Sequence, residues 1–279
     1  MTIKIVTDSV ADLPPQIVKD LDITVIPVNV CFGEEVYRDG IDISAEQFYA
    51  KLAGSKVMPV TSVPGLGVFA ETYGKLAEET DEILFISLSS KLSSVYKVAQ
   101  QSVELMKKKC RVEVVDSQWV IMAQGFIVMT AARAAQAGAS LDEVLNIVHR
   151  NINRVQLCSV FDTLEYLKRG GRIGRAAALL GTMLHVHPII GLKDGEVVPM
   201  GRKRSRAQAI DYLYDLAMSY SHIEEMSVAY VNAVEDAEML IDRLSVKFPR
   251  ERVIRSRTSP VIGTHTGPNL LVLALLGDR

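Results

Sequence analysis

Short apolar runs alternate with longer amphipathic segments through the first half of the chain. Apolar runs of strand length occur at residues 3–7, 23–31, 83–87 and 112–116. Apolar residues at helical spacing occur at residues 66–79, 93–107 and 119–137. Ser44 with Gln47, and Ser140 with Glu143, have the spacing of capping boxes, which mark the starts of two further helices. Strands that alternate with helices in this way predict parallel βαβ units.

The second half of the chain mixes hairpins with helices. Strand-like runs occur at residues 156–160, 226–231 and 252–257, and helical periodicity occurs at residues 205–219 and 235–246. Asp194-Gly195 separates two apolar runs, which is a strong signal for a hairpin turn. This mixture is typical of an α+β domain.

We therefore predict an α/β protein of two domains. Residues 1–153 form an α/β domain with a parallel sheet, and residues 154–279 form an α+β domain. Asp162, three residues before Glu165, predicts the capped start of a short helix that ends at Gly170. No low-complexity linker separates the halves, so we expect them to pack tightly.

Composition and charge exclude several classes of protein. The 279 residues are 48% hydrophobic and carry a formal net charge of -2, so no overall field attracts nucleic acid or a membrane. The three cysteines are scattered, which favours buried thiols in a reducing cytoplasm over disulfides. We see neither a signal peptide nor an apolar stretch of about 18 residues, and we expect a cytoplasmic protein.

Two hydroxyl-rich loops in the first half have the character of anion sites. Thr61 and Ser62 precede a proline and two glycines at the predicted start of a helix, where free N–H groups can bind an anion. Four serines occur within residues 89–94, and Ser93 and Ser94 lead into the next helix. The serine loop alone is better explained as a capped helix with a polar loop, but beside the second hydroxyl loop it favours a site.

Two further candidates lie in the second half. His265 lies between two threonines in a glycine-flanked loop, "GTHTG", which has the character of half an anion site. Arg172 follows a Gly-Gly pair and could hold a carboxylate or phosphate through a bidentate contact. A structural ion pair explains Arg172 equally well.

Other motifs carry weaker signals. The basic run Arg202, Lys203, Arg204 and Arg206 is typical of a solvated face, and could also contact the phosphates of a partner's nucleotide. His185 and His187 have a spacing that metals use, but no carboxylate or cysteine cluster accompanies them, so we predict no metal. The G-x-S-x-G motif of serine hydrolases is missing, and no acid is assigned to orient His265, which counts against an enzyme. A hydrolase or acyltransferase that uses Ser93 or Ser94 with His265 is kept as the alternative.

An ordered set of motifs resembles one family. "VTDSVADLP", "TSVPG", "LSSKLSSVY", "VVDS", "LEYLKRGGRIG", "DGEVVP" and "GTHTGP" follow the order and spacing of the DegV family over essentially the whole chain. The resemblance implies a two-domain α/β protein, not an enzyme, that binds one long-chain fatty acid in a buried tunnel between the domains. It places the carboxylate on Thr61, Ser93 and His265, with Ser62 and Ser94 as neighbours.

The resemblance also implies partners. Some family members are the fatty-acid-binding subunit (FakB) of a fatty acid kinase, and present the carboxylate to a separate ATP-binding protein. Arg172 and the basic run at residues 202–206 would then face that kinase. We expect no cofactor and no nucleic acid, and transient contact with a membrane is an open alternative.

The chain departs from the family pattern at four places, Gly65, Val95, His187 and Asn269, which bear on headgroup geometry and kinase partnership. His265 could be neutral, or protonated to balance the carboxylate charge. For the tail we expect an apolar lining, with candidates at Ile121, Met122, Phe126, Met129, Met183 and Leu184. Ordinary core packing explains about half of such candidates.

Overall fold

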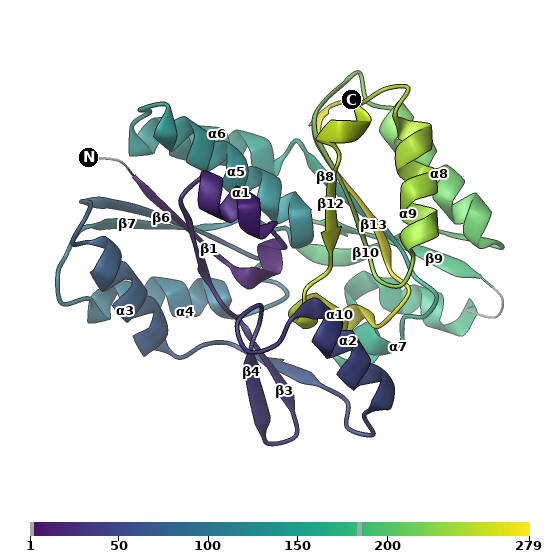
Figure 1. Ribbon diagram of the computed structural model, residues 1–279, viewed down its shortest axis with the longest axis horizontal. Coiled ribbons are helices and arrows are strands. Elements are labelled where there is room, and N and C mark those ends of the chain that lie inside the picture. The colour runs from purple at the N-terminus through teal and green to yellow at the C-terminus, as the bar shows by residue number, and fades with distance from the viewer. Residues whose placement is uncertain (1–2, 183–185) are drawn as a thin grey trace.

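A parallel four-stranded sheet organises the first half of the chain (Figure 1). The computed structural model describes residues 3–182 and 186–279. The strand order is β2 (Ile23–Ile26), β1 (Lys4–Asp8), β6 (Glu82–Ser87) and β7 (Arg111–Asp116), with parallel pairing throughout. Helices α5 (Ile121–Gln136) and α6 (Leu141–Ile152) cover one face, and α3 (Leu66–Leu76) and α4 (Val95–Ser102) cover the other. The expected parallel α/β arrangement is confirmed.

The apolar run at residues 23–31 is not one strand, as we predicted, but two. Pro27 has no N–H to donate to a ladder, and the chain leaves the parallel sheet there. The second part, β3 (Asn29–Phe32), pairs with β4 (Glu35–Arg38) and β5 (Val60–Ser62) in a small antiparallel sheet. Helix α2 (Ala45–Gly54) follows, with the predicted capping box at Ser44.

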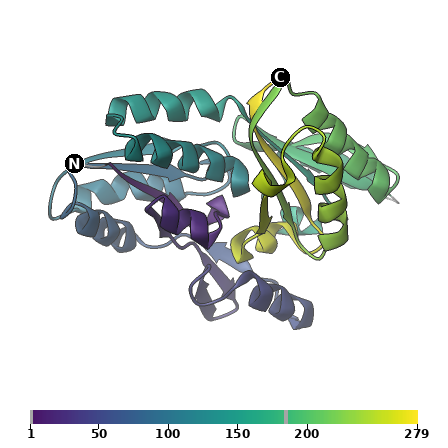
Figure 2. The ribbon, with the colours of Figure 1, turned by 45° about the horizontal axis from the view of Figure 1, so that its top comes forward.

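A six-stranded mixed sheet organises the second half. Its order is β10 (Glu196–Lys203), β9 (His187–Lys193), β8 (Val155–Val160), β13 (Leu271–Asp278), β11 (His222–Tyr230) and β12 (Ile254–Arg257). Only β11 and β12 are parallel to each other. Helices α8 (Arg206–Met218) and α9 (Val234–Leu244) cover its outer face (Figure 2). The α+β character of this half is confirmed, whereas the domain limits 1–153 and 154–279 remain a prediction.

Short elements connect these layers. They are α1 (Pro15–Asp20), α7 (Glu165–Arg169) and α10 (Pro260–Thr266), and the 3-10 turns η1 (Ser9–Ala11), η2 (Val103–Leu105), η3 (Gly174–Thr182) and η4 (Arg250–Arg252). Within residues 3–182 and 186–279, no helix combines the length and the apolar character needed to cross a membrane.

Two local predictions were wrong. Asp162 does not cap α7, because the Thr163 hydroxyl accepts from the Glu165 N–H instead. The Asp162 carboxylate is occupied by Arg206 and His187. The helix predicted at residues 93–107 ends at Ser102, where the chain tightens into η2. Strand β13 was not predicted at all, although it lies in the middle of the sheet and is almost wholly buried.

Candidate functional site

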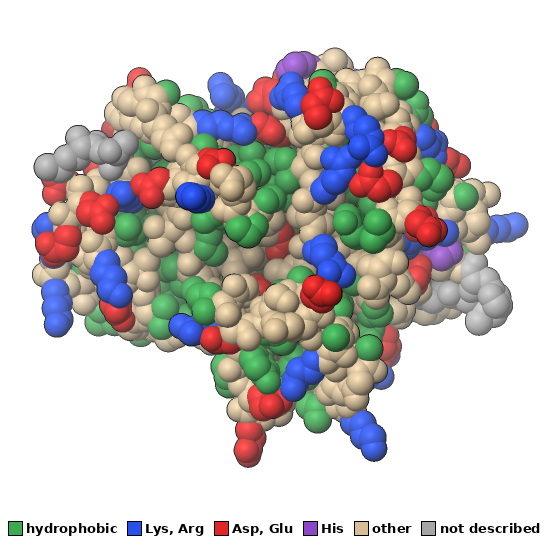
Figure 3. Space-filling model, in the orientation of Figure 1, with side chains coloured by type: hydrophobic (Ala, Val, Ile, Leu, Met, Phe, Trp, Pro, Cys, Tyr) green, Lys and Arg blue, Asp and Glu red, His purple; other side chains and the backbone are tan. Residues whose placement is uncertain are grey.

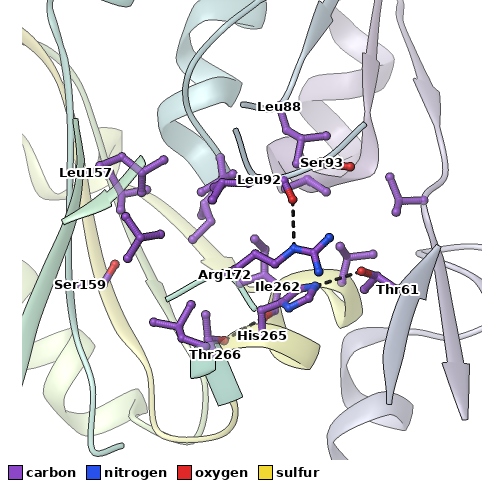
Figure 4. Close-up of a pocket in the computed structure, with 18 of the residues that line it drawn as sticks. Thr61, Leu88, Leu92, Ser93, Leu157, Ser159, Arg172, Ile262, His265 and Thr266 are labelled. Atoms are coloured by element: carbon purple, nitrogen blue, oxygen red, sulfur yellow. Dashed lines mark hydrogen bonds between the residues drawn. The ribbon is translucent and has the colours of Figure 1, made fainter. Parts of the chain in front are cut away.

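A cavity of about 300 Å³ lies between the two halves of the molecule (Figure 4). This volume is at the lower end of the range for small-molecule pockets. Both halves contribute to its mainly apolar wall, which includes Val10, Val28, Leu88, Leu92, Val120, Ile121, Leu157, Phe161, Leu167, Ile190, Leu192, Val197, Val261, Ile262 and Leu270. Such a wall suits an extended apolar ligand.

All six of the predicted polar residues line this one cavity, and Thr61, Ser93 and His265 come to it from separate elements. Thr61 comes from β5, Ser93 from the loop before α4, and His265 from α10. The Thr61 Oγ1 and His265 Nε2 atoms are hydrogen-bonded at 2.9 Å. The Ser93 hydroxyl accepts from the Val95 N–H at 3.4 Å, which fixes it at the start of α4. The structure therefore brings together residues that are up to 204 positions apart.

His265 lies on a helix, not on the loop that we expected. Ser259 caps α10 by accepting from the Ile262 N–H, and Pro260 occupies the first helical position, where no N–H is needed. Gly263 allows α10 to approach α2 closely, because a Cβ there would lie 2.5 Å from the Tyr49 hydroxyl. Local packing thus holds α10, and His265 with it, against the first half.

The environment of His265 favours the neutral imidazole. Burial, and then the positive charge of Arg172, lower the pKa of His265 to about 4. The Nδ1 atom is buried and has no hydrogen-bond partner among the described residues. It faces Gly170, where a Cβ would lie 2.3 Å from Nδ1. Nε2 is therefore the ring atom available to Thr61 or to a ligand.

Arg172 is anchored by backbone carbonyls rather than by an ion pair. Its Nε donates to the Leu92 carbonyl at 3.0 Å, and its Nη1 donates to the Gly170 carbonyl at 2.7 Å. No described carboxylate lies within salt-bridge distance of it. Arg172 thus joins the serine loop to the turn beside His265, and its charge lies at the polar end of the cavity (Figure 4).

Ser62 and Ser94 contribute less directly. Ser62 lines the cavity but its hydroxyl contacts Asn29 and Cys31, on the outer face of the small sheet. Ser94 also lines the cavity and precedes the first residue of α4, and its side chain makes no capping hydrogen bond. The two serines thus border the cavity as neighbours of Thr61 and Ser93, as the family resemblance implied.

Of the residues predicted to line the fatty acid tail, some border the cavity and others belong to the core. Ile121 lines the cavity, with a φ of 56° that is unusual for a β-branched residue. Met122, Phe126 and Met129 are core residues instead and do not reach it. Met183 and Leu184 lie outside the described residues. Most of the observed wall was not predicted, because residues such as Leu157 and Phe161 cannot be told from core positions by their type. Their spacing of two along and just after β8 could have indicated that they share one face of the strand.

The basic run does not form a continuous patch. Arg206 pairs with Asp236 and Asp162, and Lys203 is half-buried over the Tyr212 ring. Arg202 and Arg204 are the exposed members of the run. On the face drawn in Figure 3, basic and acidic side chains are interspersed. His187 contacts Asp162, and among the described residues no cluster of three or more potential ligands could hold a metal ion.

Comparisons with known proteins identify the family. Residues 2–277 match the family described as "Uncharacterised protein, DegV family". A DegV domain-containing protein of Lactococcus lactis is 38% identical over 272 residues, which cover 96% of each chain.

Solved structures with the same fold also belong to this family or bind fatty acids. A fatty-acid-binding DegV family protein from Thermus thermophilus is 30% identical with a TM-score of 0.91, covering 99% of this chain and 100% of that one. DegV of Bacillus subtilis, described as a fatty acid binding protein, gives the same identity and TM-score over 100% of both chains. A stearic-acid-binding protein from Eubacterium ventriosum is 26% identical with a TM-score of 0.88, covering 99% of this chain and 98% of that one. With the family match over nearly its whole length and this shared fold, the chain belongs to the DegV family.

Proposed function

We propose that this protein binds a long-chain fatty acid, with its carboxylate at Thr61, Ser93 and His265 and its tail in the apolar cavity. The observation that carries the proposal is the Thr61–His265 hydrogen bond at the polar end of that cavity. The solved relatives described as fatty acid binding proteins support it.

The two ends of the ligand have different energetic requirements. A carboxylate removed from water needs several donors, because a buried charge without partners is costly. The hydroxyls of Thr61 and Ser93 and an Nε2–H of neutral His265 can supply them, and Arg172 supplies a compensating charge nearby. Each CH₂ group of the tail contributes roughly 0.8 kcal/mol on burial, so the tail supplies most of the affinity.

We further propose that the protein is a non-enzymatic, cytoplasmic carrier that presents the carboxylate to a partner fatty acid kinase. Exposed Arg202 and Arg204 are suited to contact the phosphates of that partner's nucleotide. Arg172 is less suited than we first expected, because two backbone carbonyls already hold its guanidinium. Loading of the carrier would involve transient contact with a membrane.

A serine-dependent hydrolase or acyltransferase is the alternative of a different class. His265 hydrogen-bonds to Thr61 through Nε2, and its Nδ1 contacts no carboxylate that could orient the ring. This arrangement disfavours activation of Ser93. A serine-reactive fluorophosphonate probe distinguishes the two functions, because a carrier stays unlabelled and a hydrolase is labelled at Ser93.

A regulatory interaction protein is the second alternative. Two exposed arginines with acidic neighbours provide little attraction for a polyanion. Salt-dependent retention on heparin that is lost in an Arg202→Gln, Arg204→Gln variant would favour this alternative.

Native mass spectrometry of the purified protein, with a denaturing run for comparison, tests the main proposal. We expect a non-covalent adduct of fatty-acid mass that denaturation releases. The Thr61→Val variant should lose most of it, and Ser62→Ala should keep it. Absence of an adduct after incubation with palmitate or oleate would overturn the proposal.

A further inference from the structure

One hydroxyl lies far from the headgroup residues, within the apolar part of the cavity. Ser159 is the last but one residue of β8, and Leu157, Ser159 and Phe161, which directly follows the strand, alternate along the side that lines the cavity. Residues Cys158 and Val160 point the other way, into the core under α8 and α9. Ile190, its partner across the β8–β9 ladder, also lines the cavity. Ser159 is therefore a polar position within an apolar wall.

The Ser159 side chain is buried but has no protein partner. Its exposed fraction is 4%. Its hydroxyl makes no hydrogen bond to any described residue, and it borders the cavity rather than being enclosed by protein atoms. Several other buried hydroxyls are paired, since Thr7, Ser87 and Thr264 each donate to a backbone carbonyl. Figure 4 shows the Ser159 hydroxyl on the side of the cavity opposite Thr61 and Ser93.

Ser227 provides an instructive contrast. It lies in β11 of the same sheet, is equally buried, and also lacks a hydrogen-bond partner. However, Ser227 lines no part of the cavity, so protein atoms enclose its hydroxyl. Of these two serines, Ser159 is the one to which a bound ligand can supply the missing partner.

We infer that Ser159 recognises an oxygen substituent on the acyl chain, so that the ligand class includes fatty acids with a hydroxyl group along the tail. This inference rests on the proposed function. A buried hydroxyl without a partner is unfavourable, and an unsubstituted tail would leave Ser159 in that state. A hydroxyl on the chain can both donate to and accept from Ser159 Oγ. A site with such an unsatisfied group discriminates between ligands that satisfy it and ligands that do not.

The test compares stearic acid with a panel of hydroxystearic acids that carry the hydroxyl at different carbons. Dissociation constants are measured for the delipidated wild type, Ser159→Ala and the matched control Ser227→Ala. For at least one isomer, we expect Ser159→Ala to weaken binding by about fivefold, the loss of one hydrogen bond. Stearic acid should bind Ser159→Ala as tightly as the wild type or more tightly. Ser227→Ala should keep the wild-type ratio of the affinity for stearic acid to the affinity for each hydroxystearic acid.

The outcomes separate this inference from the proposed function. If the wild type binds stearic acid but Ser159→Ala leaves the affinity ratio unchanged for every isomer, the inference is wrong and the proposed function stands. The same conclusion follows if a water molecule satisfies Ser159, because the ratio then does not depend on the chain hydroxyl. If the wild type binds neither kind of fatty acid, the proposed function itself fails, and this inference with it.

Discussion

Thr61 and His265 are hydrogen-bonded at 2.9 Å although 204 positions separate them in the chain. The bond joins the small antiparallel sheet to helix α10, which also packs against β3 and α2. It closes the polar end of the cavity with two groups that are each able to donate to a carboxylate. Three predictions test how this end of the cavity works, and a fourth concerns the buried carboxyl of Asp39, which does not line it.

Replacing Thr61 with Val removes the hydroxyl and keeps the shape of the side chain. We expect fatty acid affinity to fall about tenfold or more, because a hydrogen bond to a charged group contributes roughly 1.5–3 kcal/mol. Displacement of a fluorescent fatty acid measures the change. The neighbouring Ser62→Ala should stay within about twofold of the wild type, since the Ser62 hydroxyl contacts Asn29 and Cys31. Equal losses in both variants would contradict the proposed headgroup assignment.

Gly170→Ala should weaken fatty acid binding although it removes no hydrogen-bond donor. The added Cβ would lie 2.3 Å from His265 Nδ1, so the imidazole must move away from Thr61. We expect a loss of affinity comparable to that of Thr61→Val, measured by the same displacement assay. Gly74→Ala is the matched control, because a Cβ there meets nothing within 4 Å and Ala favours helix α3. Wild-type affinity in Gly170→Ala would show that the imidazole position is unimportant.

His265 should make the protein without ligand less stable as the pH falls. Its pKa is lowered to about 4 in the folded state, against 6.5 ordinarily. Between these values the unfolded chain binds a proton that the folded chain does not, so the free energy of unfolding decreases with decreasing pH. Urea unfolding at several pH values measures the slope. His265→Gln should flatten it by up to about 3 kcal/mol over this window, and exposed His149→Gln should not.

Asp39 should make the protein less stable as the pH rises, which is opposite to the effect of His265. Burial, and then the nearby Asp8 carboxylate, raise the pKa of Asp39 to about 7 from 3.8. Between these values the folded state retains a proton that the unfolded state has lost. The protonated Asp39 therefore contributes fully to stability below pH 3.8, and this contribution is lost as the pH rises through about 7. Asp39→Asn should raise Tm at pH 8, by about 5 °C, and leave it nearly unchanged at pH 4.

Asp42 provides the control for Asp39. It is exposed, and hydrogen bonds from Arg38 lower its pKa to about 2. Asp42→Asn should therefore bring no gain in Tm at pH 8. If Asp39→Asn is no more stable than the wild type at pH 8, the Asp39 carboxyl is not held in its protonated form by burial.

The sequence by itself determined the local structure and the chemical types at the site. Alternating runs and helices predicted the parallel sheet, because the period of apolar residues reflects which side of each element is buried. The capping boxes at Ser44 and Ser140 were read correctly, since both partners of such a box lie within one turn. The hydroxyls of Thr61 and Ser93, and the imidazole of His265, were predicted to form an anion site from their residue types, and the structure brings all three to one cavity.

Only the tertiary structure decided how these residues are used. Sheet pairing turns Thr61 inward and the hydroxyl of Ser62 outward, and this depends on register with β3 rather than on the local pattern. The charge state of His265 follows from its burial beside Arg172. The cavity wall and the unpaired hydroxyl of Ser159 could not be distinguished from core, because a residue that lines a buried cavity and one that fills a core have the same composition. What separates them is the empty space between elements, which arises only when the two halves pack together.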